Sequence, residues 1–341
     1  MIQQAIAKLF SRQSLTAEEA EKVMDSIMSG IATPAQIGAY LAALRMKGET
    51  VEEIVGSARA MRAKSTHIPT QRANLVDTCG TGGDRSGTFN ISTTSAFVVA
   101  GAGVAVAKHG NRAASSQCGS ADVLVALGVN VTISPEQVGQ CIDEIGIGFA
   151  FAPTHHPAMK HAAGPRREIG SRTIFNLLGP LTNPAGALRQ LLGVFDRSLT
   201  ETVAVVLRDL GSERAMIVCG PDNVDELTTA GVNQVSELRG GQVRTYELNP
   251  HTYGFPFATL DELGGGSPDF NAAIVRSILD GTATPARHNV VLFNAATALY
   301  VSGAADDIRA GVEMAEHSIR SGEALKKLDA LTGLTNNFSG S

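Results

Sequence analysis

The spacing of apolar residues changes once along the chain. Near the amino terminus, apolar residues recur every three or four positions, for example within 20–27 and 37–44. This is the period of an α-helix that buries one face. Capping-box sequences beginning at Thr16 and Thr50 mark two helix starts. The sequence therefore predicts a small helical domain over residues 1–68.

From Asn74 onward the pattern becomes one of short apolar runs separated by helical stretches. Nearly continuous apolar strands that alternate with helices predict a mostly parallel sheet flanked by helices, and hence an α/β domain over 74–335. A later segment, 234–248, reads as a hairpin with Gly240 and Gly241 at its turn. The runs expected to be strands are NLVDTC (74–79), VAVAKH (104–109), VNVTI (129–133), IGFAFA (147–152), LLGVF (191–195) and AMIVC (215–219).

Composition narrows the class of protein. The 341 residues are 43% hydrophobic with a net charge of −5, so the chain can build a large core and has no excess of basic residues for a nucleic-acid backbone. The amino terminus turns acidic after a short apolar run, which predicts neither a secretory signal nor a membrane span. We expect a cytoplasmic protein that binds neither nucleic acid nor membrane. The four cysteines form no CxxC pair and are expected to be reduced and buried.

One glycine-rich segment, DTCGTGGDRSGTFNIST (77–93), lies between a predicted strand and a predicted helix. Glycines let backbone N–H groups approach an anion closely, and a helix that begins near Ser92 adds donors at the positive end of its dipole. The segment lacks the lysine of a P-loop and the third glycine of a dinucleotide fingerprint. It therefore predicts a different kind of phosphate-binding loop.

A second polar segment, KHGNRAASSQCGS (108–120), follows the next predicted strand. The carboxyl ends of neighbouring parallel strands lie at one edge of a sheet, where open α/β sheets bind ligands. Lys108 and Arg112 add positive charge there. The two loops together predict a pocket for a ligand that carries several phosphates.

These motifs, with GPRREIGSRTIFNLLGPLTNP (164–184) and DELTTAG (225–231), closely resemble those of the anthranilate phosphoribosyltransferase family. The resemblance implies a fold like that of the nucleoside phosphorylases, in which helices from about 160–185 join the small domain. It implies transfer of a phosphoribosyl group from 5-phosphoribosyl-1-pyrophosphate to anthranilate, a step of tryptophan biosynthesis. It further implies Mg²⁺ as cofactor and a homodimer formed through the helical domain.

The resemblance also implies site residues. Anthranilate would lie near Gly80, Asn111 and Arg166, and Mg²⁺ would be held by Ser92, Asp225 and Glu226. The phosphoribosyl donor would be bound by Gly80, Gly83, Asp84, Thr88, Asn90, Ile91, Ser92, Thr93, Lys108, His109, Gly110, Asn111, Arg112, Ala113, Ala114, Ser115, Ser116 and Ser120.

The chemistry of these residue types is consistent with such roles. Mg²⁺ prefers oxygen ligands from a few carboxylates plus substrate phosphates, which Asp225 and Glu226 can supply. A guanidinium matches a carboxylate, but Arg166 and Arg167 point about 100° apart on a helix, so only one can face a cleft; the resemblance selects Arg166. The aryl amine is neutral at pH 7, so no general base is assigned. Lys108 is expected to stabilise the leaving pyrophosphate, and His109 to relay the departing proton.

Two other functions compete with this one. A pyrimidine nucleoside phosphorylase would also handle ribose and phosphate, but that family carries a different glycine-loop pattern from GTGGD followed by NIST. A nucleic-acid-binding protein of the same fold would have lost these loops and would be expected to be more basic.

Overall fold

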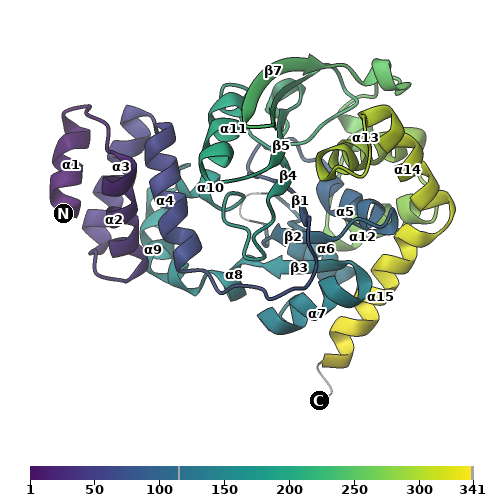
Figure 1. Ribbon diagram of the computed structural model, residues 1–341, viewed down its shortest axis with the longest axis horizontal. Helices are drawn as coiled ribbons and strands as arrows, with labels where there is room; N and C mark the ends of the chain where they lie inside the picture. Colours follow the sequence, from purple (N-terminus) through teal and green to yellow (C-terminus); the bar gives the residue numbers. More distant parts are fainter. Residues whose placement is uncertain (114–115, 339–341) are drawn as a thin grey trace.

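The computed structural model describes residues 1–113 and 116–338. Four helices open the chain: α1 (Ile2–Phe10), α2 (Ala17–Met28), α3 (Pro34–Lys47) and α4 (Val51–Ala63). Capping boxes begin α2 at Thr16, α3 at Thr33 and α4 at Thr50, with both reciprocal hydrogen bonds formed in each. The predicted helix starts are therefore confirmed, and these helices form a bundle at one end of the molecule (Figure 1).

The rest of the chain is built around one seven-stranded sheet with the order β3-β2-β1-β4-β5-β6-β7. The first five strands are parallel, and β6 and β7 add an antiparallel hairpin at the edge. A mostly parallel sheet with an added hairpin confirms the fold class expected from the sequence. The strands are β1 (Val76–Gly80), β2 (Val106–Gly110), β3 (Ile147–Phe151), β4 (Arg189–Gly193), β5 (Arg214–Cys219), β6 (Asn233–Arg239) and β7 (Gln242–Leu248).

One predicted strand is wrong. The run 129–133 lies between α6 (Ser120–Ala126) and α7 (Pro135–Ile145) and pairs with no strand. Its apolar residues Val129, Val131 and Ile133 are buried in the core, which explains the alternating pattern. Its backbone instead bonds to the last helix, α15 (Glu323–Asn337), because the Asn130 N–H donates to Thr335 Oγ1 at 3.2 Å.

The sheet separates two hydrophobic cores. Along β5, Met216 and Val218 face the core built with α5 (Ile91–Gly101), whereas Ala215 and Ile217 face the core shared with the helical bundle. This alternation is the period-two geometry of a strand buried on both faces. The first face is covered by α5, α13 (Pro285–Ser302) and α15, on which α12 (Pro268–Leu279) and α14 (Ile308–Arg320) pack. The second face is covered by α11 (Leu199–Asp209).

The segment between β3 and β4 connects the sheet with the bundle. It contains α8 (Ala152–His155), the 3₁₀ turn η1 (Pro157–Met159), α9 (Lys160–Ile169) and α10 (Phe175–Leu178). Helix α9 packs against α2 and α3, and α10 packs against α4. Figure 1 shows α8 and α10 between the bundle and the sheet, and α9 beside the bundle helices. Other 3₁₀ turns are η2 (Pro221–Asn223), η3 (Pro250–Tyr253) and η4 (Asp261–Leu263).

The order of the strands fixes where a ligand can bind. The chain moves outward from β1 through β2 to β3 and then returns to β4 on the other side of β1. This reversal makes the carboxyl ends of β1 and β4 the topological switch point, where open α/β sheets have their crevice. Among the described residues, no helix is long and apolar enough to span a membrane.

Candidate active site

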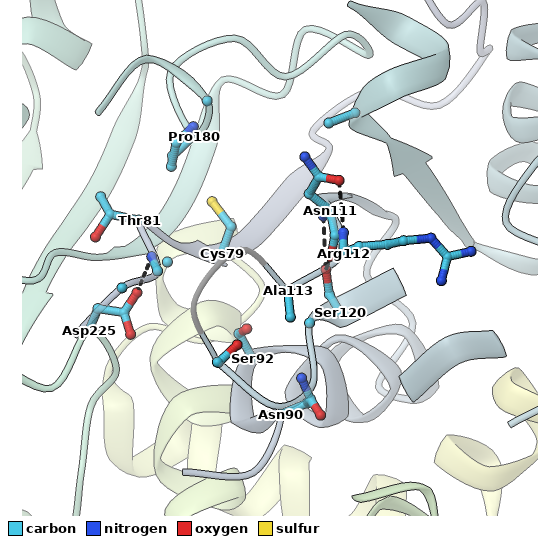
Figure 2. A pocket seen from close by; sticks show the side chains of 18 of the residues that line it. Cys79, Thr81, Asn90, Ser92, Asn111, Arg112, Ala113, Ser120, Pro180 and Asp225 are labelled. Carbon is cyan, nitrogen blue, oxygen red and sulfur yellow. Dashed lines mark hydrogen bonds between the residues drawn. The ribbon is translucent and has the colours of Figure 1, made fainter. Parts of the chain in front are cut away.

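A cavity of about 860 Å³ opens at the carboxyl ends of β1 and β2. The sheet side is lined by the glycine loop, defined as residues 80–90, and by the described parts of the loop after β2. The opposite side is lined by Met61 of α4 and by residues of α9 and α10, including Arg166 and Phe175. The cavity thus lies between the helical bundle and the sheet, and Figure 2 shows the sheet side of it.

The glycine loop has a backbone that few residues other than glycine adopt. Gly82, Gly83 and Gly87 have φ angles of 69°, 75° and 71°. A Cβ added to Gly82 would meet no atom within 4 Å, so this glycine is required by its left-handed backbone and not by crowding within the protein. The loop ends at α5, whose amino terminus carries the positive end of the helix dipole.

Three carboxylates meet beside this loop. The Asp225 carboxylate accepts a hydrogen bond from the Gly82 N–H at 2.6 Å, drawn in Figure 2. The backbone N–H of Asp225 donates to Asp84 Oδ2 at 3.4 Å. Glu226 Oε1 accepts a hydrogen bond from the Ser92 N–H at 3.1 Å. The acid pair Asp225–Glu226, remote in sequence, is thereby joined to the glycine loop and to the first turn of α5.

Burial makes these carboxylates favour a cation. It raises the pKa of Glu226 to about 7, and Lys108 opposes the shift. Burial, followed by repulsion from Asp84 and Glu226, raises the pKa of Asp225 well above its ordinary value. No group of three or more His, Cys, Asp or Glu side chains within the described residues is arranged to hold a metal by itself. The acid pair therefore suits an ion that takes its other ligands from elsewhere, such as substrate phosphate.

Two paired glycines make room for Asp225. Gly80 of β1 and Gly193 of β4 are partners in the sheet. A Cβ on Gly80 would collide with the Asp225 carboxylate, and one on Gly193 would collide with the Asp225 backbone carbonyl. Gly193 was not among the residues expected from the sequence. The signal for it was a glycine inside the apolar run LLGVF, which often marks close approach of another backbone.

We expect Gly193→Ala to displace the acid pair. The added Cβ meets backbone atoms that cannot rotate away, so residues 225–226 must shift. The dissociation constant for a divalent cation such as Mg²⁺ should rise about tenfold, the size of effect seen when metal ligands are disoriented. Gly38→Ala is the control because a Cβ there meets no atom within 4 Å. Equal Mg²⁺ titrations for wild type and Gly193→Ala would contradict this role.

Lys108 is a buried cation beneath the same loop. Its Nζ donates to the Thr78 carbonyl and to Ser92 Oγ, the latter at 3.3 Å. The nearby Asp77 carboxylate is fully buried and accepts from the His109 N–H at 3.1 Å and from Asn183 Nδ2 at 2.8 Å. These contacts hold the end of β2 and its lysine in one position at the cavity.

His109 is buried beside two other histidines. Its ring meets that of His156 edge-on, with the centroids 5.3 Å apart. Burial lowers the pKa of His109 to about 3 and that of His156 to about 4. Within the described residues, the Nε2 atoms of both rings have no hydrogen-bond partner. Both residues line the cavity in the neutral form, and their Nε2 atoms are buried.

These neutral histidines should make the folded protein sensitive to acid. Between about pH 6.5 and pH 4 the unfolded chain takes up protons at His109 and His156 and the folded chain does not, so stability falls as the pH falls. We expect the free energy of unfolding, measured with urea, to depend less steeply on pH in His156→Asn, with a slope smaller by about 1 kcal/mol per pH unit. His317→Asn, at an exposed position, should leave the slope unchanged. A wild-type slope in His156→Asn would contradict the assignment.

On the bundle side, Arg166 faces the cavity and Arg167 does not line it. The Arg166 guanidinium lies over the Phe175 ring, 5.0 Å from its centroid. Burial lowers its pKa, and no ion pair is formed by Arg166 within the described residues. A half-buried cation without a partner is suited to an anionic ligand.

The structure places most of the other residues expected from the sequence around this cavity. Ser120 Oγ donates to the Asn111 carbonyl at 3.2 Å, which closes the loop after β2. The Ile91 side chain is fully buried in the core and its N–H donates to the Phe89 carbonyl, so Ile91 is not part of the lining. Ala114 and Ser115 lie outside the described residues. Lining residues from the expected set are Gly80, Gly83, Asp84, Thr88, Asn90, Ser92, Thr93, Lys108, His109, Gly110, Asn111, Arg112, Ala113, Ser116 and Ser120.

A distant segment also reaches the cavity, and sequence reasoning missed it. Gly265, Gly266 and Asn271 line the cavity near α5. Asn271 Nδ2 donates to Asn90 Oδ1 at 2.9 Å, and a Cβ on Gly265 would meet the Phe89 backbone. The run GGGS at 264–267 was the available signal. The four cysteines are free and buried, as expected.

The family models, the related sequences and the solved structures that match this chain agree on one family. Residues 3–65 match the helical bundle domain and residues 72–325 the a/b domain of a glycosyl transferase family. An anthranilate phosphoribosyltransferase of Moorella thermoacetica is 57% identical over 331 residues, covering 97% of both chains. Among solved structures, the anthranilate phosphoribosyltransferase of Thermus thermophilus has a TM-score of 0.93 and 43% identity, covering 97% of this chain and 99% of its own. That of Saccharomyces cerevisiae, in complex with PRPP and Mg, has a TM-score of 0.89 and 26% identity, covering 98% of both chains.

Proposed function

The chain belongs to the anthranilate phosphoribosyltransferases, within a glycosyl transferase family built from a helical bundle and an α/β domain, and on this premise we propose how its cavity works. The activity is transfer of the phosphoribosyl group from 5-phosphoribosyl-1-pyrophosphate to the amine of anthranilate, in tryptophan biosynthesis. The observation that carries the proposal is the junction of the glycine loop, Lys108 and the acid pair at one cavity.

The glycine loop and the start of α5 are proposed to hold the phosphates of the donor. The left-handed glycines let the backbone of the loop approach an anion closely, and Ser92 and Thr93 lie in the first turn of α5. The loop after β2 adds the Asn111 and Ser120 side chains. A diphosphate needs many donors and a positive potential, which a helix amino terminus and Lys108 together provide.

Mg²⁺ is proposed to be held by Asp225, Glu226 and Ser92, with donor phosphate completing the set. The fit rests on the raised pKa values of the two carboxyl groups and on the link from Glu226 to the Ser92 N–H. The Saccharomyces cerevisiae relative was solved with PRPP and Mg. Bound there, the ion supplies charge neutralisation for the pyrophosphate.

The reaction forms a bond between the amine nitrogen and C1 of the ribose as the bond from C1 to pyrophosphate breaks. The amine is already neutral, so the residues of the cavity mainly align it and stabilise the leaving group. Lys108 and the glycine-loop N–H groups are proposed to stabilise charge on pyrophosphate. His109 is proposed to relay the departing amine proton. Because its pKa is lowered to about 3, its contribution to the rate should be modest.

Anthranilate is proposed to bind between the bundle and the sheet, near Gly80 and Asn111, with its carboxylate on Arg166. We expect Arg166→Gln to raise the KM for anthranilate about 10- to 50-fold and to change the KM for the donor little, because one charge-assisted contact is lost. Steady-state kinetics with each substrate varied would measure both. Arg167→Gln is the control. Equal changes for the two substrates in Arg166→Gln would contradict a carboxylate clamp.

The activity is tested by following the loss of anthranilate fluorescence with purified protein, the phosphoribosyl donor and Mg²⁺. Turnover should require all three, and omission of any one should abolish it. Turnover of thymidine or uridine with phosphate, and none of anthranilate, would replace this function with a nucleoside phosphorylase activity.

The assembly is proposed to be a cytoplasmic homodimer joined through the helical domain, residues 1–68, with 74–335 as the catalytic domain. Phe10, Ile31 and Met46 in the bundle region have exposed fractions of 70%, 73% and 76%. Large apolar side chains left exposed on one small domain suit a protein interface. Sedimentation should give a dimer for the wild type and a monomer for the Phe10→Glu, Met46→Glu variant; a monomeric wild type would contradict the proposal.

A further inference from the structure

Arg172 lies outside the cavity lining but contacts the glycine loop. It belongs to the segment between α9 and α10, and its guanidinium donates to the Gly83 carbonyl. The same guanidinium lies over the Phe195 ring, 3.9 Å from the centroid. Phe195 is itself tied to the loop, because its N–H donates to Thr81 Oγ1 at 3.1 Å. Arg172 therefore connects the bundle side of the cavity with the loop on the sheet side.

The position of Arg172 is fixed from both ends. Helix α9 ends at Gly170, whose φ is 61°. Beyond Arg172, the Thr173 N–H donates to Asn176 Oδ1 at 3.0 Å, which anchors the start of α10. A short segment held at both ends can carry a side chain whose direction does not vary.

The hydrogen bond from Arg172 to the Gly83 carbonyl bears on the orientation of the peptide between Gly83 and Asp84. The Gly83 carbonyl and the Asp84 N–H belong to one planar trans peptide and point in opposite directions. Gly82 and Gly83 have positive φ angles, and glycine backbone permits either orientation of such a peptide. A carbonyl oxygen turned toward the cavity would repel phosphate, whereas an N–H group would bind it.

We propose that Arg172 is a positioning residue that locks the Gly83–Asp84 peptide with its N–H group toward the phosphates of the donor. The carbonyl is held on the side of Arg172, which does not line the cavity, while Gly83 and Asp84 both do. Arginine suits this role because its planar fork can donate a hydrogen bond and stack on Phe195 at the same time. The inference rests on the proposed function of the cavity as a diphosphate site.

The test compares Arg172→Met, which loses both contacts, with Arg172→Lys, which keeps a hydrogen-bond donor. Arg167→Met is the matched control, since Arg167 is an exposed arginine on the neighbouring helix. Calorimetric titration with the donor and Mg²⁺, and separately with pyrophosphate and Mg²⁺, should show about tenfold weaker binding for Arg172→Met. Arg172→Lys should be intermediate, and the KM for anthranilate should stay within about twofold in every variant.

A spectroscopic signature separates peptide orientation from general stability. In the wild type, the Asp84 amide resonance should shift downfield when pyrophosphate and Mg²⁺ bind, and this shift should be lost in Arg172→Met. Unchanged donor affinity in Arg172→Met, an unchanged Asp84 shift, or equal weakening for donor and anthranilate would overturn the proposal. If the wild type itself bound neither donor nor pyrophosphate, the proposed function would fail as well, and that result is distinguishable from failure of the Arg172 variants alone.

Discussion

Lys108→Met should lower kcat by about 10²- to 10³-fold, the cost of removing one preorganised group that stabilises developing negative charge. The lysine has a fixed direction because the Thr78 carbonyl and Ser92 Oγ accept from its Nζ. It is 3% exposed, so water cannot replace its charge. Stopped-flow or steady-state anthranilate fluorescence would measure the loss.

A matched control separates catalysis from the burial of a cation. The Lys47 side chain is 7% exposed, pairs with Glu53 at 2.9 Å, and lies in the helical bundle outside the cavity lining. Lys47→Met should lower thermal stability with little change in kcat for the folded protein. If Lys108→Met lost stability but kept kcat, the lysine would be a structural cation and its proposed role would be wrong.

The double variant Asp225→Asn, Glu226→Gln should raise the Mg²⁺ concentration for half-maximal activity by about 100-fold. An Asn oxygen at position 225 can still accept from the Gly82 N–H, so the loop contact survives while the charge that attracts the ion is lost. Titration of activity against Mg²⁺, at saturating donor and anthranilate, gives the result directly.

The same variant should weaken the response to Mg²⁺ but should not destabilise the metal-free protein. Burial raises the pKa of Asp225, and Asp84 and Glu226 add repulsion. Removal of both charges should therefore leave the melting temperature of the metal-free protein unchanged or higher. Asp222→Asn is the control, because Asp222 is exposed with a φ of 56°, which Asn tolerates. A lower melting temperature with unchanged Mg²⁺ response would show that the acid pair is structural.

Two features were predicted correctly from local pattern and one was not. The capping boxes at Thr16 and Thr50 form as predicted, because the bonds join residues three apart. The hairpin 234–248 forms because its turn glycines, Gly240 and Gly241, have φ angles of 59° and 75°. The run 129–133 alternates like a strand but has no partner, since alternation reports burial on one side and does not identify what lies beside the backbone.

By itself, the sequence determined the helical period of the bundle, the parallel sheet, the glycine-rich loop between a strand and a helix, and the family to which the chain belongs. These follow from contacts within a few residues and from motifs that lie together in the chain. Only the tertiary structure decided that Gly193 makes room for Asp225, that Gly265 and Asn271 reach the glycine loop, that burial lowers the pKa of His109, and that Arg172 holds the Gly83 carbonyl. Each of these depends on excluded volume, desolvation or a bond between segments more than thirty residues apart, which exist only after the sheet has brought the segments together.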